Sequence, residues 1–432
     1  MTPRTTRGDI ECHRRGVTTG LQAREGNLVL LVSDYVPARG GTTTQTRLHA
    51  KELLRRGRSV VVLTRRIPGQ GSSETIDGVS VRRVGVPGRS AAAKLGELGT
   101  SWLWLVRRRA SIAGVGAMLD SDFAIVARLA GLRDTTIMTW VTLGDATRLL
   151  SGRLGTIRKL LLKGVQHVAL TPRLEDELHG LGIPEVSVIP VPVDTMHFHI
   201  PTQQERSDAR QGFDLGSECV ILFVGHLQER KAIDRLLEAF DRLQDRPEGL
   251  VLFIVGGPVD PKDSSYVDVL REVAERPHLR GRVTFWGPRD DVCTFLHAAD
   301  IFCLPSHREG MPNVLLEAMA CGLACVAPPS AGGDELLRPG SGIVPVTNTP
   351  ECLTDALAYL VENPDERTAM GVRATEAVRL ANQPAQIARQ YEHLWARGRL
   401  LGTGDIAHSD EITPARSRLT RLWLRLKSQR LN

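Results

Sequence analysis

The 432-residue sequence is poor in aromatic residues and contains no long hydrophobic run. Phenylalanine, tryptophan and tyrosine together make up 4% of the chain. No stretch approaches the roughly 20 apolar residues that a membrane-spanning helix needs. The first 26 residues are polar and rich in arginine, and they lack the apolar segment of an export signal. We therefore expect residues 1–26 to form a disordered basic tail, and the protein to be cytoplasmic, either soluble or peripheral to a membrane.

Cysteine pairs with metal-binding spacing are also missing. The seven cysteines lie at positions 12, 219, 293, 303, 321, 325 and 352, and no two of them form a CxxC motif. An odd number of cysteines without an export signal favours reduced thiols. We interpret Cys321 and Cys325 as small buried residues rather than metal ligands. His197 and His199, which flank Phe198, are likewise expected to pack or to face solvent. We therefore expect no metal site and no cofactor.

The sequence does contain short apolar runs that alternate with longer amphipathic stretches, a pattern typical of parallel α/β sheets. The pattern runs through residues 27–195, is interrupted by a polar linker over 194–216, and resumes over 215–385. Open sheets of this kind bind ligands at the carboxyl ends of their strands. We predict an α/β fold of two Rossmann-like domains that face a central cleft. The predicted strands span residues 28–32, 59–64, 79–84, 136–139, 165–170 and 186–189 in the first domain, and 219–224, 250–255, 283–286, 301–304 and 324–327 in the second.

The sharpest local signal is a pair of glutamates, Glu309 and Glu317. A buried strand is predicted just before them, and a helix is expected to begin near Pro312 and to end at Gly322. The backbone N–H groups of the segment Gly310–Asn313 then form the positive end of the helix, which suits a phosphate or sugar hydroxyls. Glu317 lies inside the helix and can accept hydrogen bonds from a ribose diol, as acidic residues do in dinucleotide-binding folds.

Two glycine-containing loops complete the pattern. Gly225 follows a predicted strand, and Arg230 and Lys231 stand just before the next helix. Cations at a helix start are unfavourable unless an anion binds there, so a bound diphosphate would explain them. Gly40 and Gly41 precede the first long helix of the chain and suit a turn that approaches a phosphate. On its own, either loop is also explained by an ordinary solvated turn.

Together, and in this order, the three segments resemble the GT4 family of retaining glycosyltransferases, whose EX7E motif matches Glu309 and Glu317. The resemblance covers about residues 28–399 and implies the two-domain fold known as GT-B. It also implies that a helix over 386–400 crosses back onto the first domain. The implied reaction moves a sugar from a nucleotide-sugar, such as a UDP- or GDP-sugar, to a glycan or lipid-linked acceptor. The family's chemistry uses the leaving phosphate as the proton acceptor. Lys231, Arg230 and the helix end near Gly310 can stabilise the leaving diphosphate without a metal.

The resemblance also assigns roles to single residues. Lys231 would hold the donor diphosphate, with Arg230 as a second cation. Glu309 would face the transferred sugar, and Glu317 would bind the ribose. Gly41 would pack against the diphosphate from the opposite domain. The expected donor-binding residues are Gly40, Gly41, Gly225, His226, Gly310, Met311, Pro312, Asn313 and Glu317.

The sequence departs from the family pattern at two places. His226 stands where the family usually has arginine, so this position is neutral or only conditionally charged at pH 7. The first-domain histidine that contacts the sugar in many members is absent from the stretch Thr139–Asp145, where Asp145 is our candidate for positioning the acceptor or sugar. These departures keep open an alternative function, a catalytically weakened scaffold that binds nucleotide-sugars.

Other motifs are weaker. Asp120 and Asp122 resemble the metal-binding DxD motif of single-domain glycosyltransferases, but no long apolar strand is predicted before them, which favours a chance match. Gly114 and Gly116 lack the third glycine of a dinucleotide-binding fingerprint. A nucleotide-sugar epimerase and a pyridoxal-phosphate-dependent phosphorylase fit the motifs less well. No recognition motif supports nucleic-acid binding.

Two stretches suggest contact with an anionic membrane surface, in a chain whose formal net charge is +6. Ser101–Arg109 places tryptophans and leucines beside three arginines. The tail over 403–432 carries a basic amphipathic pattern at 416–430, which suits an anionic lipid interface. The alternatives are a core helix for the first stretch and a disordered or partner-binding tail for the second. A membrane role would favour a lipid-linked acceptor, as in polysaccharide biosynthesis.

Overall fold

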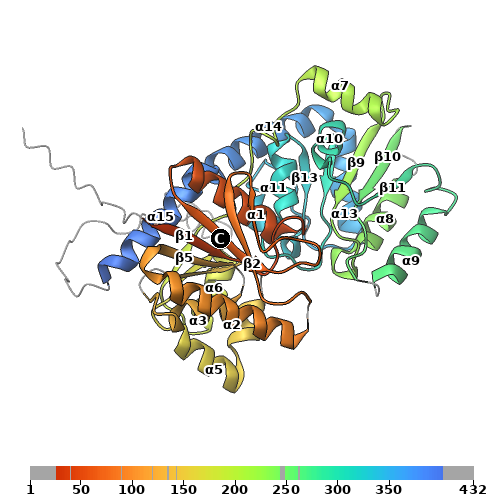
Figure 1. The fold of residues 1–432 in the computed structure, drawn as a ribbon. Helices are drawn as coiled ribbons and strands as arrows, with labels where there is room; N and C mark the ends of the chain where they lie inside the picture. The colour runs from red at the N-terminus through yellow and green to blue at the C-terminus, as the bar shows by residue number, and fades with distance from the viewer. Residues whose placement is uncertain are drawn as a thin grey trace, which may run out of the picture.

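The computed structural model describes residues 26–401, apart from residues 39, 89, 119, 134–135, 143, 244–248 and 261–262 and the side chains of residues 398–401. The two predicted tails therefore lie outside the described residues, except for Gly26. The chain forms two α/β domains, the first drawn from red to yellow and the second from green to blue in Figure 1. The predicted α/β fold of two parallel-sheet domains is confirmed.

The first domain is built on an eight-stranded sheet in the order β3-β4-β2-β1-β5-β6-β7-β8. All neighbouring strands run parallel except β3, which pairs antiparallel with β4. The central strands are apolar throughout because helices cover both faces of a parallel sheet. The strands span Asn27–Leu31 (β1), Val60–Arg65 (β2), Ser73–Ile76 (β3), Val79–Val84 (β4), Ile112–Met118 (β5), Thr136–Trp140 (β6), Gln166–Ala169 (β7) and Val186–Val188 (β8).

The second domain contains a five-stranded parallel sheet in the order β11-β10-β9-β12-β13. Its aliphatic strands and the helices around them form one continuous hydrophobic core. The strands span Cys219–Val224 (β9), Leu250–Val255 (β10), Val283–Gly287 (β11), Ile301–Cys303 (β12) and Ala324–Val326 (β13).

Helices connect the strands of both sheets. Those of the first domain are Gly41–Arg55 (α1), Ala91–Arg108 (α2), Ser121–Leu129 (α3), Asp145–Leu150 (α4), Gly152–Leu161 (α5) and Pro172–Gly180 (α6), with the 3-10 turn Arg109–Ser111 (η1). The remainder of the described chain adds Gln203–Gly212 (α7), Ile233–Asp241 (α8), Ser264–Ala274 (α9), Val292–Ala298 (α10), Asn313–Ala320 (α11), Gly333–Leu336 (α12), Pro350–Glu362 (α13), Pro364–Ala381 (α14) and Pro384–Leu401 (α15), with the 3-10 turns Glu229–Lys231 (η2) and Pro329–Ala331 (η4).

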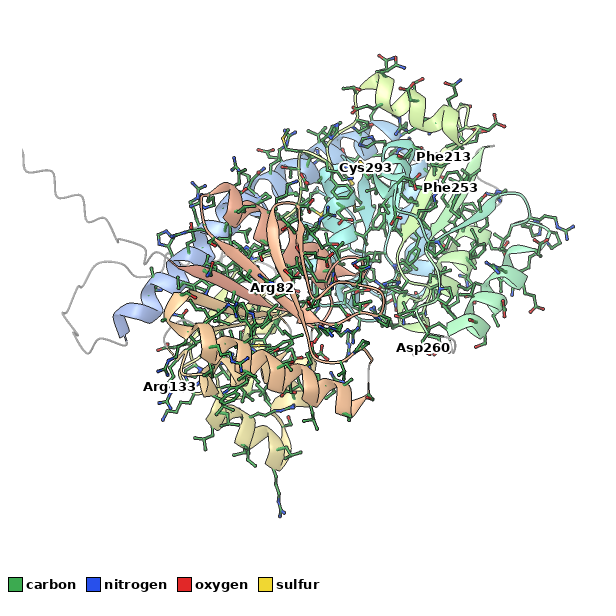
Figure 2. All side chains as sticks on the ribbon, in the orientation of Figure 1. Arg82, Arg133, Phe213, Phe253, Asp260 and Cys293 are labelled. Carbon is green, nitrogen blue, oxygen red and sulfur yellow. The ribbon has the colours of Figure 1, made fainter. Side chains whose placement is uncertain are left out.

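The segment predicted as a polar linker contains the helix α7. A capping box between Thr202 and Glu205 starts this helix. Arg206 pairs with Asp300 at 2.7 Å, so a polar face holds α7 to the second domain. Phe213, directly after α7, packs against Phe253 with ring centroids 5.7 Å apart (Figure 2). The connector thus contains a helix that was not predicted, and both charged side chains and Phe213 hold it to the second domain.

Strand β5, which pairs with β1 at the centre of the first sheet, was not predicted from the sequence. Gly114 and Gly116 lower the strand propensity of this run. In the structure, they leave space for a side chain from α15. A Cβ atom at Gly114 would lie 2.7 Å from the ring of Trp395 on α15. The glycines therefore make room for a tryptophan that packs directly on the sheet.

The strand β5 also removes the reason given for dismissing the DxD motif, because a buried apolar strand does precede Asp120. The two carboxylates are nevertheless engaged elsewhere. Asp120 pairs with Lys94 at 2.5 Å and caps the first turn of α3, and Asp122 pairs with Arg158 at 2.9 Å. Both carboxylates thus hold helices of the first domain together.

The chain crosses between the domains at two neighbouring places. The Val193 N–H donates a hydrogen bond to the Asn382 carbonyl at 2.9 Å, and the Asn382 side chain donates one to the Val191 carbonyl at 2.8 Å. After Asn382, helix α15 returns to the first domain, where Ile387 and Trp395 belong to its core. The two crossings are thus joined by buried hydrogen bonds.

Replacing Trp395 by alanine is expected to lower the free energy of unfolding by about 3–5 kcal/mol, the range for a buried tryptophan. Trp395 is 2% exposed, and it fills the space left by Gly114 and Gly116. Urea denaturation of this variant beside Trp102→Ala, which removes a 41% exposed tryptophan, measures the difference. Equal midpoints for the two variants would show that α15 does not stabilise the first domain.

Candidate active site

Loops that follow parallel strands of both sheets meet between the two domains. The first domain contributes the loop that leads into α1 at Gly41, and the loop after β6, with Val141. The second contributes η2 and the loop between β12 and α11, with Glu309 and Gly310. These are carboxyl ends of strands, where open α/β sheets bind their ligands.

The centre of this region is an ion pair between Lys231 and Glu309. The Lys231 ammonium lies 2.6 Å from a Glu309 carboxylate oxygen, and both side chains are about one-tenth exposed. The more exposed Arg230 approaches the same carboxylate at 3.4 Å. Burial lowers the pKa of Lys231, and the negative charge of Glu309 opposes this effect. Two cations and one carboxylate leave a positive charge at this point, which suits an anionic ligand.

His226 adds no positive charge at neutral pH. Desolvation lowers its pKa from 6.5, and the nearby charges of Lys231 and Arg230 lower it further. The imidazole is therefore neutral at pH 7, where the resembled family usually has a permanent cation. Positive charge in this loop is consequently supplied by Arg230 and Lys231.

The loop before α11 packs directly on the first domain through a glycine. A Cβ atom at Gly310 would lie 2.2 Å from the Val141 carbonyl oxygen and 2.7 Å from the Thr142 Cα. Both neighbouring atoms belong to the backbone, so neither can swing away as the end of a side chain can. Gly310 is thus required for this approach of the two domains.

Asn313, the first residue of α11, joins the two domains through its side-chain amide. Its Nδ2 donates a hydrogen bond to the Gly41 carbonyl at 3.2 Å, and its Oδ1 accepts one from Gln45 at 2.9 Å. The predicted residues Gly41 and Asn313 are therefore brought together from opposite domains. Gly40 precedes them with a φ of 152°, a conformation that favours glycine.

The other predicted residues of this loop lie behind the charged centre. Pro312 precedes the first turn of α11. Met311 is buried and lines an apolar cavity of about 140 Å³ between the domains, together with Leu170 and Leu316. Neither Lys231 nor Glu309 lines this cavity, so it is separate from the charged centre.

Glu317 lies in the second turn of α11, as the sequence predicted. Burial raises the pKa of its carboxyl group from 4.5 to about 7, with a smaller contribution from Cys293. Among the described residues, no side chain or backbone group is hydrogen-bonded to this carboxyl group. Glu317 is partly exposed, and a carboxyl group with a raised pKa at the edge of a cleft is a candidate for binding a ligand.

This pKa gives a testable pH dependence. The ribose role predicted for Glu317 requires the ionised carboxylate, so nucleotide affinity is expected to fall as the pH drops through about 7, by up to about tenfold per pH unit below it. Calorimetric titration of a nucleotide at several pH values measures the slope. Glu317→Gln should flatten it, whereas Glu376→Gln, at an exposed site on α14, should keep it. An equal slope in both variants would exclude Glu317 as its origin.

Asp145 stays a prediction. The carboxylate lies at the start of α4 and pairs with Arg148 of the same helix at 3.3 Å. The preceding Gly144 faces the second domain, where a Cβ atom would lie 3.0 Å from an Arg308 guanidinium nitrogen. The loop therefore reaches the cleft, although Asp145 itself is engaged within its own helix.

Gln45 and Arg308 were not predicted as site residues from the sequence. Gln45 lies on α1, one turn after Gly40 and Gly41, and it is 3% exposed. Its position after the paired glycines is the sequence signal that could have identified it. Arg308 directly precedes Glu309 in the sequence, but only the structure shows that it approaches Gly144 across the domains.

Comparisons with known proteins agree with this geometry. Residues 40–194 match a family model described as glycosyl transferase 4-like domain, and residues 204–377 match one described as glycosyl transferases group 1. The chain is 29% identical over 374 residues to D-inositol 3-phosphate glycosyltransferase of Kineococcus radiotolerans, which covers 78% of this chain and 85% of that one.

Two further matches are more limited. A GDP-mannose-dependent alpha-(1-6)-phosphatidylinositol monomannoside mannosyltransferase of Mycobacterium tuberculosis is 30% identical over 200 residues, 44% of this chain and half the length of that relative. Among solved structures, sucrose-phosphate synthase from Thermosynechococcus elongatus superposes with a TM-score of 0.73 and 20% identity, over 88% of this chain and 100% of that one.

Proposed function

The chain belongs to the GT4-type glycosyltransferases of the GT-B fold, and on this premise we propose that it transfers a sugar with retention of anomeric configuration and without a metal. The donor is a nucleotide-sugar, and we propose a UDP- or GDP-sugar. The acceptor is a glycan or a lipid-linked sugar. The observation that carries the proposal is the buried Lys231–Glu309 pair at the meeting point of the two domains.

The charges of this site suit the departure of a nucleoside diphosphate. Negative charge grows on the diphosphate as the glycosidic bond breaks, and preorganised cations and N–H groups stabilise it. Lys231 and Arg230 supply the cations, and the amino end of α11 supplies N–H groups. The leaving phosphate then accepts the proton of the acceptor hydroxyl, and Glu309 faces the sugar. These groups supply the stabilisation without a metal ion or another cofactor.

The identity of the nucleotide is the least constrained part of the proposal. The mycobacterial relative is named as GDP-mannose-dependent, which supports a GDP-sugar. That match spans about half of the relative, so a UDP-sugar is proposed beside it. In either case the ribose is bound by Glu317.

A transfer assay with product analysis tests the proposal. Release of the nucleoside diphosphate is followed with UDP- and GDP-sugars, and nuclear magnetic resonance of the product reports whether the anomeric configuration is kept. Glu309→Gln is expected to abolish most of the turnover. An inverted product would contradict retention, and full activity without added Mg²⁺ or Mn²⁺ is required for a reaction that uses no catalytic metal.

One observation favours a second candidate, a weakened enzyme that binds nucleotide-sugars as a scaffold. His226 is neutral at pH 7, so the diphosphate site has one cation fewer than the resembled pattern. This candidate predicts that a nucleotide-sugar binds but is not turned over with any acceptor. Sustained turnover would remove it.

An exposed apolar surface on the first domain supports our proposal of a lipid-linked acceptor. Helix α5 exposes Leu154 (77%), Ile157 (54%) and Leu160 (70%), with the exposed cations Arg153 and Lys163 beside them. Figure 1 places α5 at the margin of the first domain. Exposed leucines next to cations suit an anionic lipid interface.

Residues 101–108 of the predicted membrane-contact stretch belong to α2, and Arg109 begins η1. Some side chains of this stretch are buried in the core, and others lie on the surface. Leu105 is buried, and Arg108 stacks on Trp104 at 5.0 Å, whereas Trp102 and Leu103 remain partly exposed. The predicted tail at 416–430 lies outside the described residues. Within the described part of the chain, every helix is too short or too polar to cross a bilayer. We therefore propose peripheral attachment to the cytoplasmic face of a membrane.

Sedimentation with vesicles of phosphatidylcholine, alone or mixed with phosphatidylglycerol, tests this attachment in the full chain. We expect binding only to the anionic vesicles and a clear loss of binding in Leu154→Glu/Leu160→Glu. The matched control is Leu380→Glu, which changes a 58% exposed leucine on α14 of the second domain. Equal binding of both variants would exclude α5 as the contact.

A further inference from the structure

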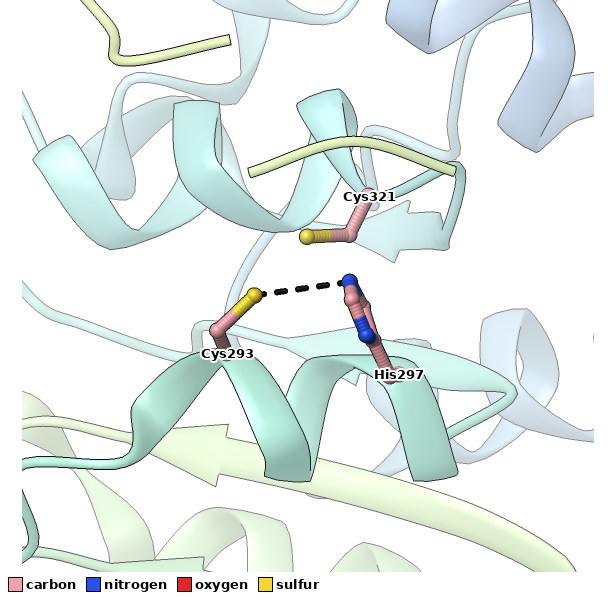
Figure 3. Close-up of side chains that lie close together, drawn as sticks. All are labelled: Cys293, His297 and Cys321. Atoms are coloured by element: carbon pink, nitrogen blue, oxygen red, sulfur yellow. Dashed lines mark hydrogen bonds between the residues drawn. The ribbon is translucent and has the colours of Figure 1, made fainter. Parts of the chain in front are cut away.

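Three metal-ligating side chains converge in the second domain, outside the proposed transfer chemistry. Cys293 and His297 lie four residues apart on α10 and so share one face of that helix. Cys321 approaches them from the end of α11, and the three ligand atoms all lie within 4.8 Å of one another (Figure 3). The Cys293 sulfur is 3.4 Å from His297 Nε2. Among the described residues, this cluster alone brings three such groups together.

The connector between the domains covers this cluster. The Cys293 thiol donates a hydrogen bond to the His197 carbonyl at 3.2 Å. His297 and Cys321 are buried and Cys293 is half-buried, so little water reaches the site.

A second imidazole ring, that of His199, lies beside the cluster. The rings of His199 and His297 have centroids 5.2 Å apart. Two imidazoles bound to one tetrahedral ion, with metal–nitrogen bonds of about 2.0–2.1 Å, have centroids about 5 Å apart. His199 is now hydrogen-bonded to Glu205 at 3.2 Å, a contact that suits the second nitrogen of a metal-bound histidine.

We propose that Cys293, His297, Cys321 and His199 bind one zinc-class ion in a structural site. Two thiolates and two imidazoles in a tetrahedron form the ligand set that selects zinc among the common divalent ions. Metal binding releases the thiol protons of Cys293 and Cys321 to solvent and ties α10, α11 and the connector together.

This site borders Glu317, which lies one turn before Cys321, but it is separate from the charged centre at Lys231 and Glu309 and does not depend on the proposed transfer chemistry. Cys321 ends α11, whereas Glu309 and Gly310 precede the beginning of the same helix. The proposed transfer chemistry uses no metal, so the ion acts on the structure of the second domain and of the connector. The histidines at 197 and 199 were expected to pack or to face solvent. The ring of His199 instead packs on a candidate ligand.

Cobalt(II) titration of the reduced, chelator-treated full chain tests the proposal. We expect thiolate-to-cobalt charge-transfer bands in the near ultraviolet and intense visible bands of tetrahedral cobalt, saturating at one ion per chain. One equivalent of zinc should bleach them. Wild-type protein that shows neither set of bands would overturn the proposal without any variant.

The variants assign the ligands. Cys293→Ser and Cys321→Ser should each lose most of the charge-transfer intensity, whereas Cys352→Ser, at a half-buried cysteine outside the cluster, should keep it. His199→Ala should change the visible bands, and an unchanged spectrum would contradict the four-ligand set. Thiol titration and mass spectrometry detect the alternative chemistry, which is a disulfide between two of the cysteines. A Cys293–Cys321 disulfide in the protein as purified, with no bound metal, would overturn the proposal.

Discussion

Replacing Gly310 by alanine is expected to lower the rate of sugar transfer by about 100-fold. The new Cβ atom would lie 2.2 Å from the Val141 carbonyl oxygen, so the two domains cannot approach as closely as they do in the wild-type protein. Reacting groups that are misplaced by about 1 Å lose about 10²-fold in rate. Most of the proposed donor-binding residues lie on the second domain, so we expect nucleotide affinity to change only a few-fold.

The matched control is Gly212→Ala, a glycine of the second domain with no atom within 4 Å of the added Cβ. This variant should keep wild-type activity and a wild-type midpoint of thermal unfolding. Steady-state kinetics give the transfer rate, and calorimetry gives nucleotide affinity for both variants. Wild-type turnover in Gly310→Ala would show that the observed contact between the domains is not the arrangement that catalyses transfer.

Replacing Lys231 by alanine is expected to lower kcat by about 10²–10³-fold, the cost of removing one preorganised group that stabilises developing charge. Lys231 is buried and lies 2.6 Å from Glu309, whereas Arg230 is half-exposed and more distant. A buried cation interacts more strongly with a diphosphate because water does not screen it. Arg230→Ala is therefore expected to cost less, since solvent already weakens its charge.

Two controls separate the loss of a charge from the loss of the fold. Lys231→Ala leaves the Glu309 carboxylate buried without its principal partner, so the free energy of unfolding must be measured beside the kinetics. Lys51→Ala removes an exposed cation from α1 of the first domain and should leave kcat unchanged. A kcat for Lys231→Ala within about threefold of the wild type would contradict its assignment to the leaving diphosphate.

The fold was predictable because its strands carry strong local signals. Runs such as Val60–Arg65 and Leu250–Val255 are almost continuous aliphatic sequences, as buried parallel strands require. Strand β5 lacked such a signal because Gly114 and Gly116 interrupt it. Their role depends on Trp395, a residue far along the chain, and local propensity contains no information about such a partner.

The candidate site was predictable where its residues belong to one short motif. Glu309 and Glu317 share a loop and a helix, so their spacing fixes their relation. Contacts across the cleft were not predictable in this way. Gln45 and Asn313 are 268 positions apart and meet only because the two domains close on each other. The cysteines at 293 and 321 likewise come from separate β–α units, so their spacing in the sequence does not predict that they lie close together.

Thermal unfolding of the full chain with UDP, GDP, ADP and CMP tests the central claim most directly, with Lys231→Ala measured in parallel. A nucleotide at about 100 times its Kd stabilises the folded state by roughly 2.7 kcal/mol, which shifts the midpoint visibly. We predict a shift with UDP or GDP that is much smaller in Lys231→Ala. The absence of a shift with all four nucleotides, or an equal shift in the variant, would contradict a diphosphate site at Lys231 and Glu309.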